Sequence, residues 1–195
     1  FQMALIILIT PALSAALISA ERESGAWQLL QMTPLKPRQI VIGKLLSVVS
    51  TVVLLLLATL PGYAVLIIVD QGFMPRVRAV LITLGLTALM ALMLGAACSS
   101  LWRKTAVTTA AGYLLLILLC VGTLVVWLAE DALFGPEFVE STLMLNPLAT
   151  GLSLMRVPGF DDYNLVPGNW RFMAIASVGL AAVLWLRTWW LRRPE

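Results

Sequence analysis

The long uncharged apolar runs of this chain constrain its fold more than any other feature. Five runs contain no Asp, Glu, Lys or Arg, and a helix of about 20 apolar residues crosses about 30 Å of hydrocarbon. Lipid offers the backbone no hydrogen-bond partner, so only helices or a closed barrel can span it, and the short alternating segments of a barrel are absent. We therefore predict an all-α, polytopic membrane protein with five visible transmembrane helices. They cover residues 3–20, 45–69, 79–101, 106–128 and 172–186, the last extended to residue 191.

Composition agrees with this fold class. Charged residues make up 12% of the chain and hydrophobic residues 61%, whereas about a quarter of an ordinary soluble domain is charged. The net charge of +3 comes from cations scattered at the ends of apolar runs and not from a basic stripe. We therefore expect membrane lipid around the chain and no nucleic acid as a partner.

The basic residues predict the orientation of the spans. Cytoplasmic flanks are enriched in Lys and Arg, and alternation of five spans places nine of these residues on one side and four on the other. The richer side holds the stretch 18–44 and the C-terminus. We therefore expect a multi-pass protein of the cell membrane, specifically the bacterial cytoplasmic membrane, with a cytoplasmic C-terminus.

The largest external piece covers residues 129–171. Asn146 followed by Pro147 is a helix-start signal, after which Leu148, Leu152 and Met155 would share one face. We predict short amphipathic helices on the outer membrane surface. They cover residues 148–155 and, with a weaker signal, 136–145. In the second span, Pro61 and Gly62 predict a kink or the outer end of the helix.

Residue patterns of catalysis and metal binding are missing from the sequence. The chain has no histidine, which excludes a Ser–His pair, and it lacks the Cys-x-x-Cys spacing of a zinc site. Asp161, Asp162 and Asn164 lack the spacing of an EF-hand and predict a solvated loop. An intramembrane enzyme acting on lipid would need buried acid–base residues, which the apolar runs do not contain. We expect that the chain is not an enzyme by itself and holds no cofactor or metal.

The source of energy for any transport must lie outside this chain. Gly43 and Lys44 resemble the end of a phosphate-binding loop, but Arg38 and Leu45 stand where that loop requires Gly and Ser or Thr. Ion-coupled transporters place ionisable residues within the membrane, and the five runs have none. Their Ser, Thr and Gly residues either pack helices together, which we favour, or line a polar path.

Charge interrupts the apolar sequence most abruptly after the first run. Glu21, Arg22 and Glu23 stand where the first span ends, and the following residues 27–32 form a brief apolar surface that Pro34 terminates. The residues alone fit two interpretations. One is a short helix across the cytoplasmic mouth, and the other is a charged loop that anchors the neighbouring spans.

The stretch SAERESGAWQLLQMTPLKPRQIVIGKLL resembles a signature of ATP-binding-cassette (ABC) transporter permeases of the type-2 exporter class. In that family the second span ends in a Ser-x-Glu-Arg-Glu-like element, followed by Gly, an amphipathic coupling helix, a Thr-Pro-Leu turn and a Gly-Lys pair that opens the third span. The turn Ser99–Lys104 and the external Leu145–Leu148 are also similar to the family. The matching residues of the signature are Ser19, Glu21, Arg22, Glu23, Gly25, Leu29, Leu30, Thr33, Pro34, Leu35, Gly43 and Lys44.

The resemblance implies a single transmembrane permease domain over residues 1–195. Because the family has six spans, it also implies that one span is missing ahead of Phe1 and that the sequence is truncated at its N-terminus. The region 21–34 would be the cytoplasmic coupling helix. The residues implied to contact the ATPase are Glu21, Arg22, Glu23, Gly25, Trp27 and Leu30, with Arg103 and Lys104 as a second contact.

The function implied by the resemblance is that of a permease subunit in an ATP-driven exporter. Its partners would be a cytoplasmic ABC ATPase subunit, which binds ATP and Mg²⁺, and a second permease subunit in a homo- or heterodimer. Rigid-body movement driven by the ATPase requires no coupling ion, which suits the uncharged spans. The alternative is a non-transporting membrane anchor or regulatory subunit of a membrane complex.

Overall fold

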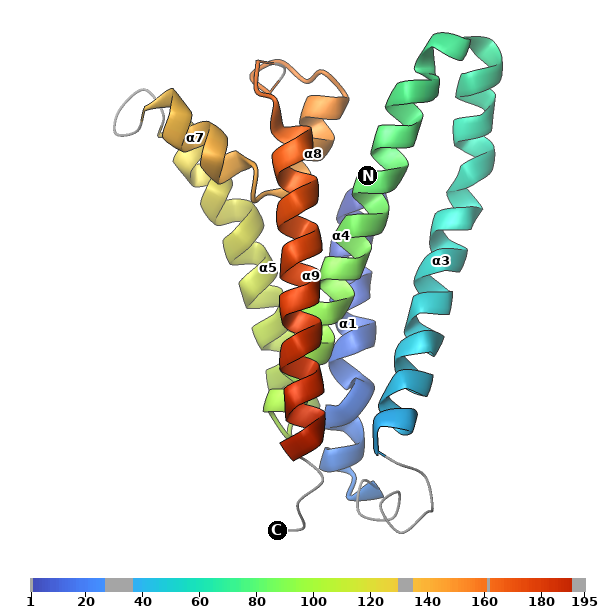
Figure 1. Cartoon of the computed structure of the whole chain (residues 1–195), viewed down its shortest axis with the longest axis vertical. Helices are drawn as coiled ribbons and strands as arrows, with labels where there is room; N and C mark the ends of the chain where they lie inside the picture. Colours follow the sequence, from blue (N-terminus) through green and yellow to red (C-terminus); the bar gives the residue numbers. More distant parts are fainter. Residues whose placement is uncertain (1, 27–36, 130–134, 161, 191–195) are drawn as a thin grey trace.

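The fold is a bundle of five long helices with two short helices packed at one end (Figure 1). It is seen in a computed structural model that describes residues 2–26, 37–129, 135–160 and 162–190. The long helices are α1 (Gln2–Glu23), α3 (Pro37–Val69), α4 (Met74–Leu101), α5 (Thr105–Leu128) and α9 (Leu165–Trp190). The short elements are η1 (Gln71–Phe73), α7 (Pro136–Leu143) and α8 (Pro147–Leu154).

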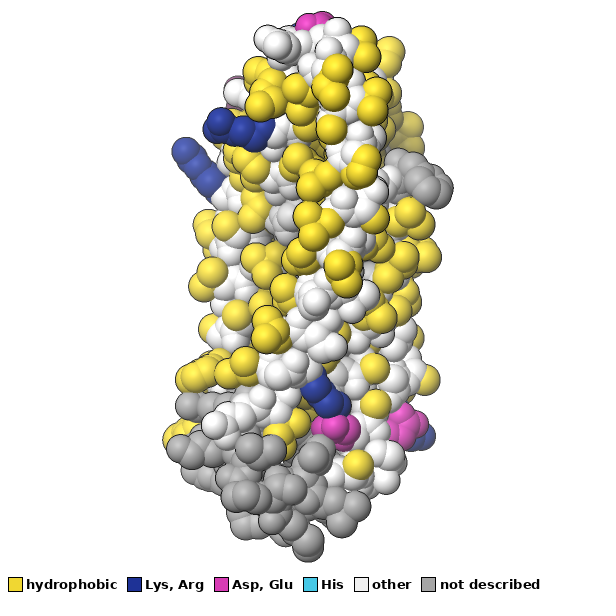
Figure 2. Space-filling model, turned by 90° about the vertical axis from the view of Figure 1, so that its right-hand side faces the viewer, with side chains coloured by type: hydrophobic (Ala, Val, Ile, Leu, Met, Phe, Trp, Pro, Cys, Tyr) yellow, Lys and Arg dark blue, Asp and Glu magenta, His cyan; other side chains and the backbone are white. Residues whose placement is uncertain are grey.

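The predicted fold class is confirmed. Each of the five long helices is long and apolar enough to cross a membrane, and no strand occurs in the described part of the chain. Figure 2 shows hydrophobic side chains over the middle of the α3 side, with charged side chains only toward its two ends. This distribution is typical of a multi-pass membrane protein.

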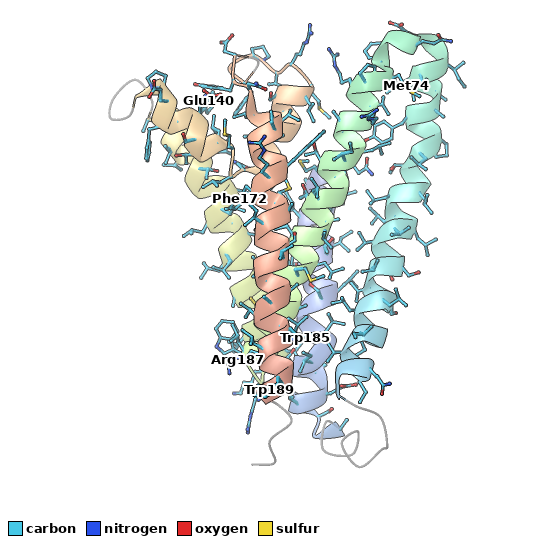
Figure 3. The ribbon with its side chains drawn as sticks, in the orientation of Figure 1. Met74, Glu140, Phe172, Trp185, Arg187 and Trp189 are labelled. Carbon is cyan, nitrogen blue, oxygen red and sulfur yellow. The ribbon has the colours of Figure 1, made fainter. Side chains whose placement is uncertain are left out.

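The two ends of the bundle differ in what they join. At one end α3 and α4 are connected through η1, and we call it the hairpin end; α7 and α8 lie toward this end (Figure 1). At the other end α1 stops, α3 begins and α4 turns into α5, and we call it the junction end. Figure 3 shows Trp185, Arg187 and Trp189 at the junction end of α9. Both indoles are half exposed, as in the aromatic belt of a membrane interface.

Helix α4 is the centre of the bundle, because it contacts each of the other long helices as well as α8. It approaches α1 closely at Gly95. A Cβ atom on Gly95 would overlap the Ser14 side chain and would lie 3.1 Å from the Pro11 carbonyl oxygen. Small residues at a helix contact allow the backbones to approach closely, which stabilises association where lipid supplies no hydrophobic driving force.

Buried hydroxyl groups in the spans support the predicted packing role of these residues. Thr83, Thr87 and Thr108 are completely buried, and each donates to the carbonyl oxygen four residues earlier in its own helix. Their hydrogen-bonding capacity is therefore satisfied without water. Tyr113 Oη of α5 donates to the Leu8 carbonyl oxygen of α1 at 2.5 Å, one turn before Pro11 interrupts the backbone hydrogen bonds of that helix.

Of the two alternatives predicted at Pro61 and Gly62, the outer end of the helix is wrong. Helix α3 does not end at Pro61 but continues to Val69, and its 33 residues extend about 50 Å. A helix tolerates an internal proline when its other hydrogen bonds hold it in register, although one bond is lost.

Helix α8 begins at Pro147 after an Asn146 cap, as predicted, and it packs against the bundle. It contacts α1, α4, α5 and α9, and it buries the small residues Ala149 and Thr150 against them. The predicted stripe of Leu148, Leu152 and Met155 lines a cavity whose other walls belong to α1, α3, α4 and α5. Small residues allow the closest approach of neighbouring helices, whereas Leu148 and Leu152 beside the cavity are half-buried and Met155 is exposed.

Candidate functional site

The candidate site is a polar helix junction built around the last turn of α1. We define the α1 junction by Glu21, Arg22 and Glu23 together with the residues of other helices that they and their neighbours contact. Those residues are Lys44 of α3, Ser99 and Ser100 of α4, and Thr105 of α5. The three charged residues are consecutive, so their side chains leave the helix about 100° apart and can reach three different neighbours.

Glu21 connects α1 to the start of α3. Its Oε1 lies 2.5 Å from Lys44 Nζ, and the same ammonium donates to the Leu17 carbonyl oxygen of α1 at 3.1 Å. The side chain of Glu21 is 18% exposed and that of Lys44 is 34% exposed. Glu21 Oε2 is buried and has no hydrogen-bond partner within the described ranges. Lys44 is therefore the principal countercharge of this carboxylate among the described residues.

Arg22 connects α1 to the end of α4. Its guanidinium donates to the Ser100 carbonyl oxygen at 3.4 Å, and Ser100 is the next-to-last residue of α4. The last four carbonyl groups of a helix have no partner within the helix. A cation at that end also interacts favourably with the helix dipole.

Glu23 connects α1 to the start of α5. Its Oε2 accepts from the Thr105 backbone N–H at 2.8 Å, at the first residue of α5. The N-cap residue Lys104 provides no side-chain cap of its own, but its charge attracts the Glu23 carboxylate. A carboxylate is favourable at a helix N-terminus, where backbone N–H groups are unpaired and the dipole is positive. Glu23 therefore acts as the cap that the α5 sequence lacks.

Next to the charged residues, Ser99 of α4 is hydrogen-bonded to the backbone of α1. Its Oγ accepts from the backbone N–H groups of Ile18 and Ser19 at 2.7 Å and 2.9 Å, and all three residues are fully buried. One hydroxyl thus satisfies two amides of a neighbouring helix one turn before the charged residues. The lower part of α1 is held by both polar and apolar contacts, because Leu17 and Ile18 also pack with Val41 and Ala96.

The predicted ATPase-contact residues fall into two groups. Glu21, Arg22, Glu23 and Gly25 are described, and so are Arg103 and Lys104 between α4 and α5. The Glu23–Thr105 bond and the Arg22–Ser100 bond bring the two predicted contact regions together at the junction end. Trp27 and Leu30, with most of the predicted coupling helix, lie outside the described residues.

Gly25 turns the chain away from α1. Its φ is +75°, a left-handed conformation that side chains disfavour, and no atom lies within 4 Å of where its Cβ would be. Glycine is common in this conformation just after the end of a helix. The position therefore demands Gly for its backbone conformation and not for lack of space.

Sequence reasoning did not assign a site role to Lys44, Ser99, Ser100 or Thr105. Lys44 carried a sequence signal for an ion pair. It is a cation at the start of one apolar run, and acidic residues stand at the end of the preceding run. The other three carried none, because they act through a hydroxyl or a backbone group. The junction joins four helices through polar contacts. The described residues contain no cluster of three potential metal ligands.

Comparison with family models identifies a known family. A family model described as "ABC-2 family transporter protein" matches residues 1–186. Searches of curated proteins and of solved structures gave no match.

Proposed function

Because the chain belongs to the ABC-2 transporter family and is a permease of an ABC transporter, we propose that it exports a substrate using ATP hydrolysed by a partner. The permease domain is not itself catalytic. The partner would be an ABC ATPase on the cytoplasmic side, where it would bind ATP and Mg²⁺. A second permease subunit, identical or different, would complete the transport path.

The observation that carries the proposal is the α1 junction. Three consecutive charged residues hold the start of α3, the end of α4 and the start of α5. A displacement of the chain that follows Glu23 would therefore act on four transmembrane helices together. Rigid-body movement of packed helices is a common way in which binding at one site opens another.

The residues of the junction would then have two roles. Glu21 and Lys44 would transmit movement between α1 and α3, which flank the segment 27–36. Arg22 and Glu23 would transmit it to the α4–α5 turn, where Arg103 and Lys104 would face the ATPase. The uncharged spans suit this mechanism, because the free energy enters through the junction and not through an ion bound in the membrane.

The proposal is tested by reconstituting the permease with its candidate ATPase and measuring ATP hydrolysis. We expect the permease to raise the hydrolysis rate and Glu21→Ala to remove most of that increase. Glu137→Ala is the matched control, because Glu137 is an acidic residue in the first turn of α7 near the hairpin end. A photoreactive group at Ser24, an exposed residue directly after α1, should crosslink to the ATPase.

Two results would contradict the proposal. Crosslinking only from the hairpin end would place the ATPase on the wrong side of the bundle. A stable complex whose hydrolysis rate does not respond to the permease would instead support a membrane anchor.

A further inference from the structure

A groove at the hairpin end combines an apolar lining with an arginine that has no acidic partner among the described residues. The groove lies between α3, α4 and α9 and encloses about 620 Å³, within the range of about 300–1,000 Å³ found for ligand pockets. Its apolar walls include Ile67 of α3, Leu81 and Ile82 of α4, and Trp170 of α9. Figure 3 shows Met74, another lining residue, near the hairpin end of α4.

Arg78 is the charged residue of this lining. Its side chain is exposed, and it forms no ion pair with any residue that the structure describes. A guanidinium presents N–H donors in a fork that matches a phosphate group. An anionic ligand in the groove would therefore supply Arg78 with the countercharge that the described residues do not.

The position of Arg78 along α4 matches the headgroup layer of a membrane. Arg78 is the last charged residue before the uncharged run 79–101. From Arg78 to the end of α4 at Leu101 the helix rises about 35 Å, slightly more than the hydrocarbon thickness of about 30 Å. Trp170 likewise stands just before the uncharged run that starts at Phe172, and indoles favour this interface.

The depth of the groove separates its polar and apolar parts. Trp170 Nε1 donates to Thr83 Oγ1 at 2.8 Å, which places the indole beside a residue five positions deeper than Arg78. Five residues of helix correspond to about 7.5 Å. A molecule in the groove would meet the arginine first and then Ile82 and the indole, in the order of a phosphate group and an acyl chain.

We infer that this groove binds one anionic phospholipid of the surrounding leaflet, with its phosphate on Arg78 and an acyl chain against Trp170. The site is separate from the α1 junction, which lies at the opposite end of α4. A zwitterionic lipid would fit the apolar part equally, but its cationic headgroup would offset the attraction of the arginine. The net negative charge is therefore the selective feature.

The experiment measures quenching of Trp170 fluorescence by lipids with brominated acyl chains in nanodiscs. The Trp170 signal is the difference between the wild-type protein and Trp170→Phe. Brominated phosphatidylglycerol and brominated phosphatidylcholine with identical chains are compared at the same low mole fraction. We expect the anionic lipid to be preferred about fivefold, which corresponds to about 1 kcal/mol for one basic residue near an anionic headgroup.

Arg78→Gln should remove this preference and leave quenching by phosphatidylcholine unchanged. Arg156→Gln is the control, because Arg156 is exposed near the same end of the bundle but does not line the groove. Equal quenching by the two lipids in the wild-type protein would overturn the inference. A preference that survives Arg78→Gln, or an absence of quenching because another protein copy covers Trp170, would also overturn it.

Discussion

Replacing Lys44 by methionine is expected to destabilise the α1 junction more than loss of an ordinary surface ion pair would. The substitution keeps the length and apolar stem of the side chain. It removes the 2.5 Å ion pair with Glu21 and the hydrogen bond to the Leu17 carbonyl oxygen. Because Glu21 Oε2 already lacks a partner among the described residues, both carboxylate oxygens would then be left without their observed countercharge.

The magnitude follows from the partial burial of the pair. Exposed ion pairs contribute about 0–1 kcal/mol, and loss of one partner of a fully buried pair costs about 3–5 kcal/mol. Glu21 is 18% exposed, but Lys44 is 34% exposed and partly screened by solvent. We therefore expect a loss of about 2 kcal/mol. For a chain of this length that corresponds to a decrease in Tm of about 4–8 °C.

The assay is thermal unfolding of the purified protein in one detergent, followed by circular dichroism. Glu21→Gln and the double variant Glu21→Gln/Lys44→Met complete a double-mutant cycle. The double variant should be more stable than Lys44→Met alone, because it no longer contains an unpaired carboxylate. A change below about 1 °C for Lys44→Met, or strictly additive effects in the cycle, would refute the assigned interaction.

Three further predictions concern the same bundle. Ser99→Ala should lower the free energy of unfolding by about 1–3 kcal/mol, because two buried amides lose their acceptor; an unchanged Tm in the same assay would refute this. Gly95→Ala should destabilise the α1–α4 contact, because the new Cβ atom would overlap Ser14. Gly122→Ala should be neutral or stabilise α5 by up to about 1 kcal/mol, because its Cβ atom would meet no atom within 4 Å. Equal Tm values for the two variants would contradict the close approach of α1 and α4. Gly25→Ala should cost about 1–2 kcal/mol at its φ of +75°, and Gly25→Asn less; the reverse order in thermal unfolding would argue against a left-handed turn.

Part of the candidate site was predictable from the sequence. Three charged residues directly after an uncharged run mark the end of a span, and Asn146–Pro147 marks the start of α8, because both signals lie within a few adjacent residues. The partners of the charged residues carried much weaker signals. Glu23 caps a helix that begins 82 positions later, and its donor is a backbone N–H that every residue except proline possesses.

Burial within the bundle was harder to predict than the spans themselves. In a soluble protein a stripe of Leu148, Leu152 and Met155 would indicate the buried face of a helix. Next to lipid and between helices, close packing favours small side chains, so α8 buries Ala149 and Thr150. The same reason explains why Gly95 of α4 lies close to Ser14 of α1.

The sequence by itself determined that this chain forms apolar helices long enough to cross a membrane and that it contains no histidine. Each of those properties depends on the residue content of one segment, because transfer of a segment into hydrocarbon depends on its own side chains. Only the tertiary structure decided that α4 lies at the centre, that Glu21, Arg22 and Glu23 reach three different helices, and that Arg78 shares a groove with Trp170. Those relations depend on the shapes of surfaces far apart in the chain, and the composition of a single segment does not specify which surface it will meet.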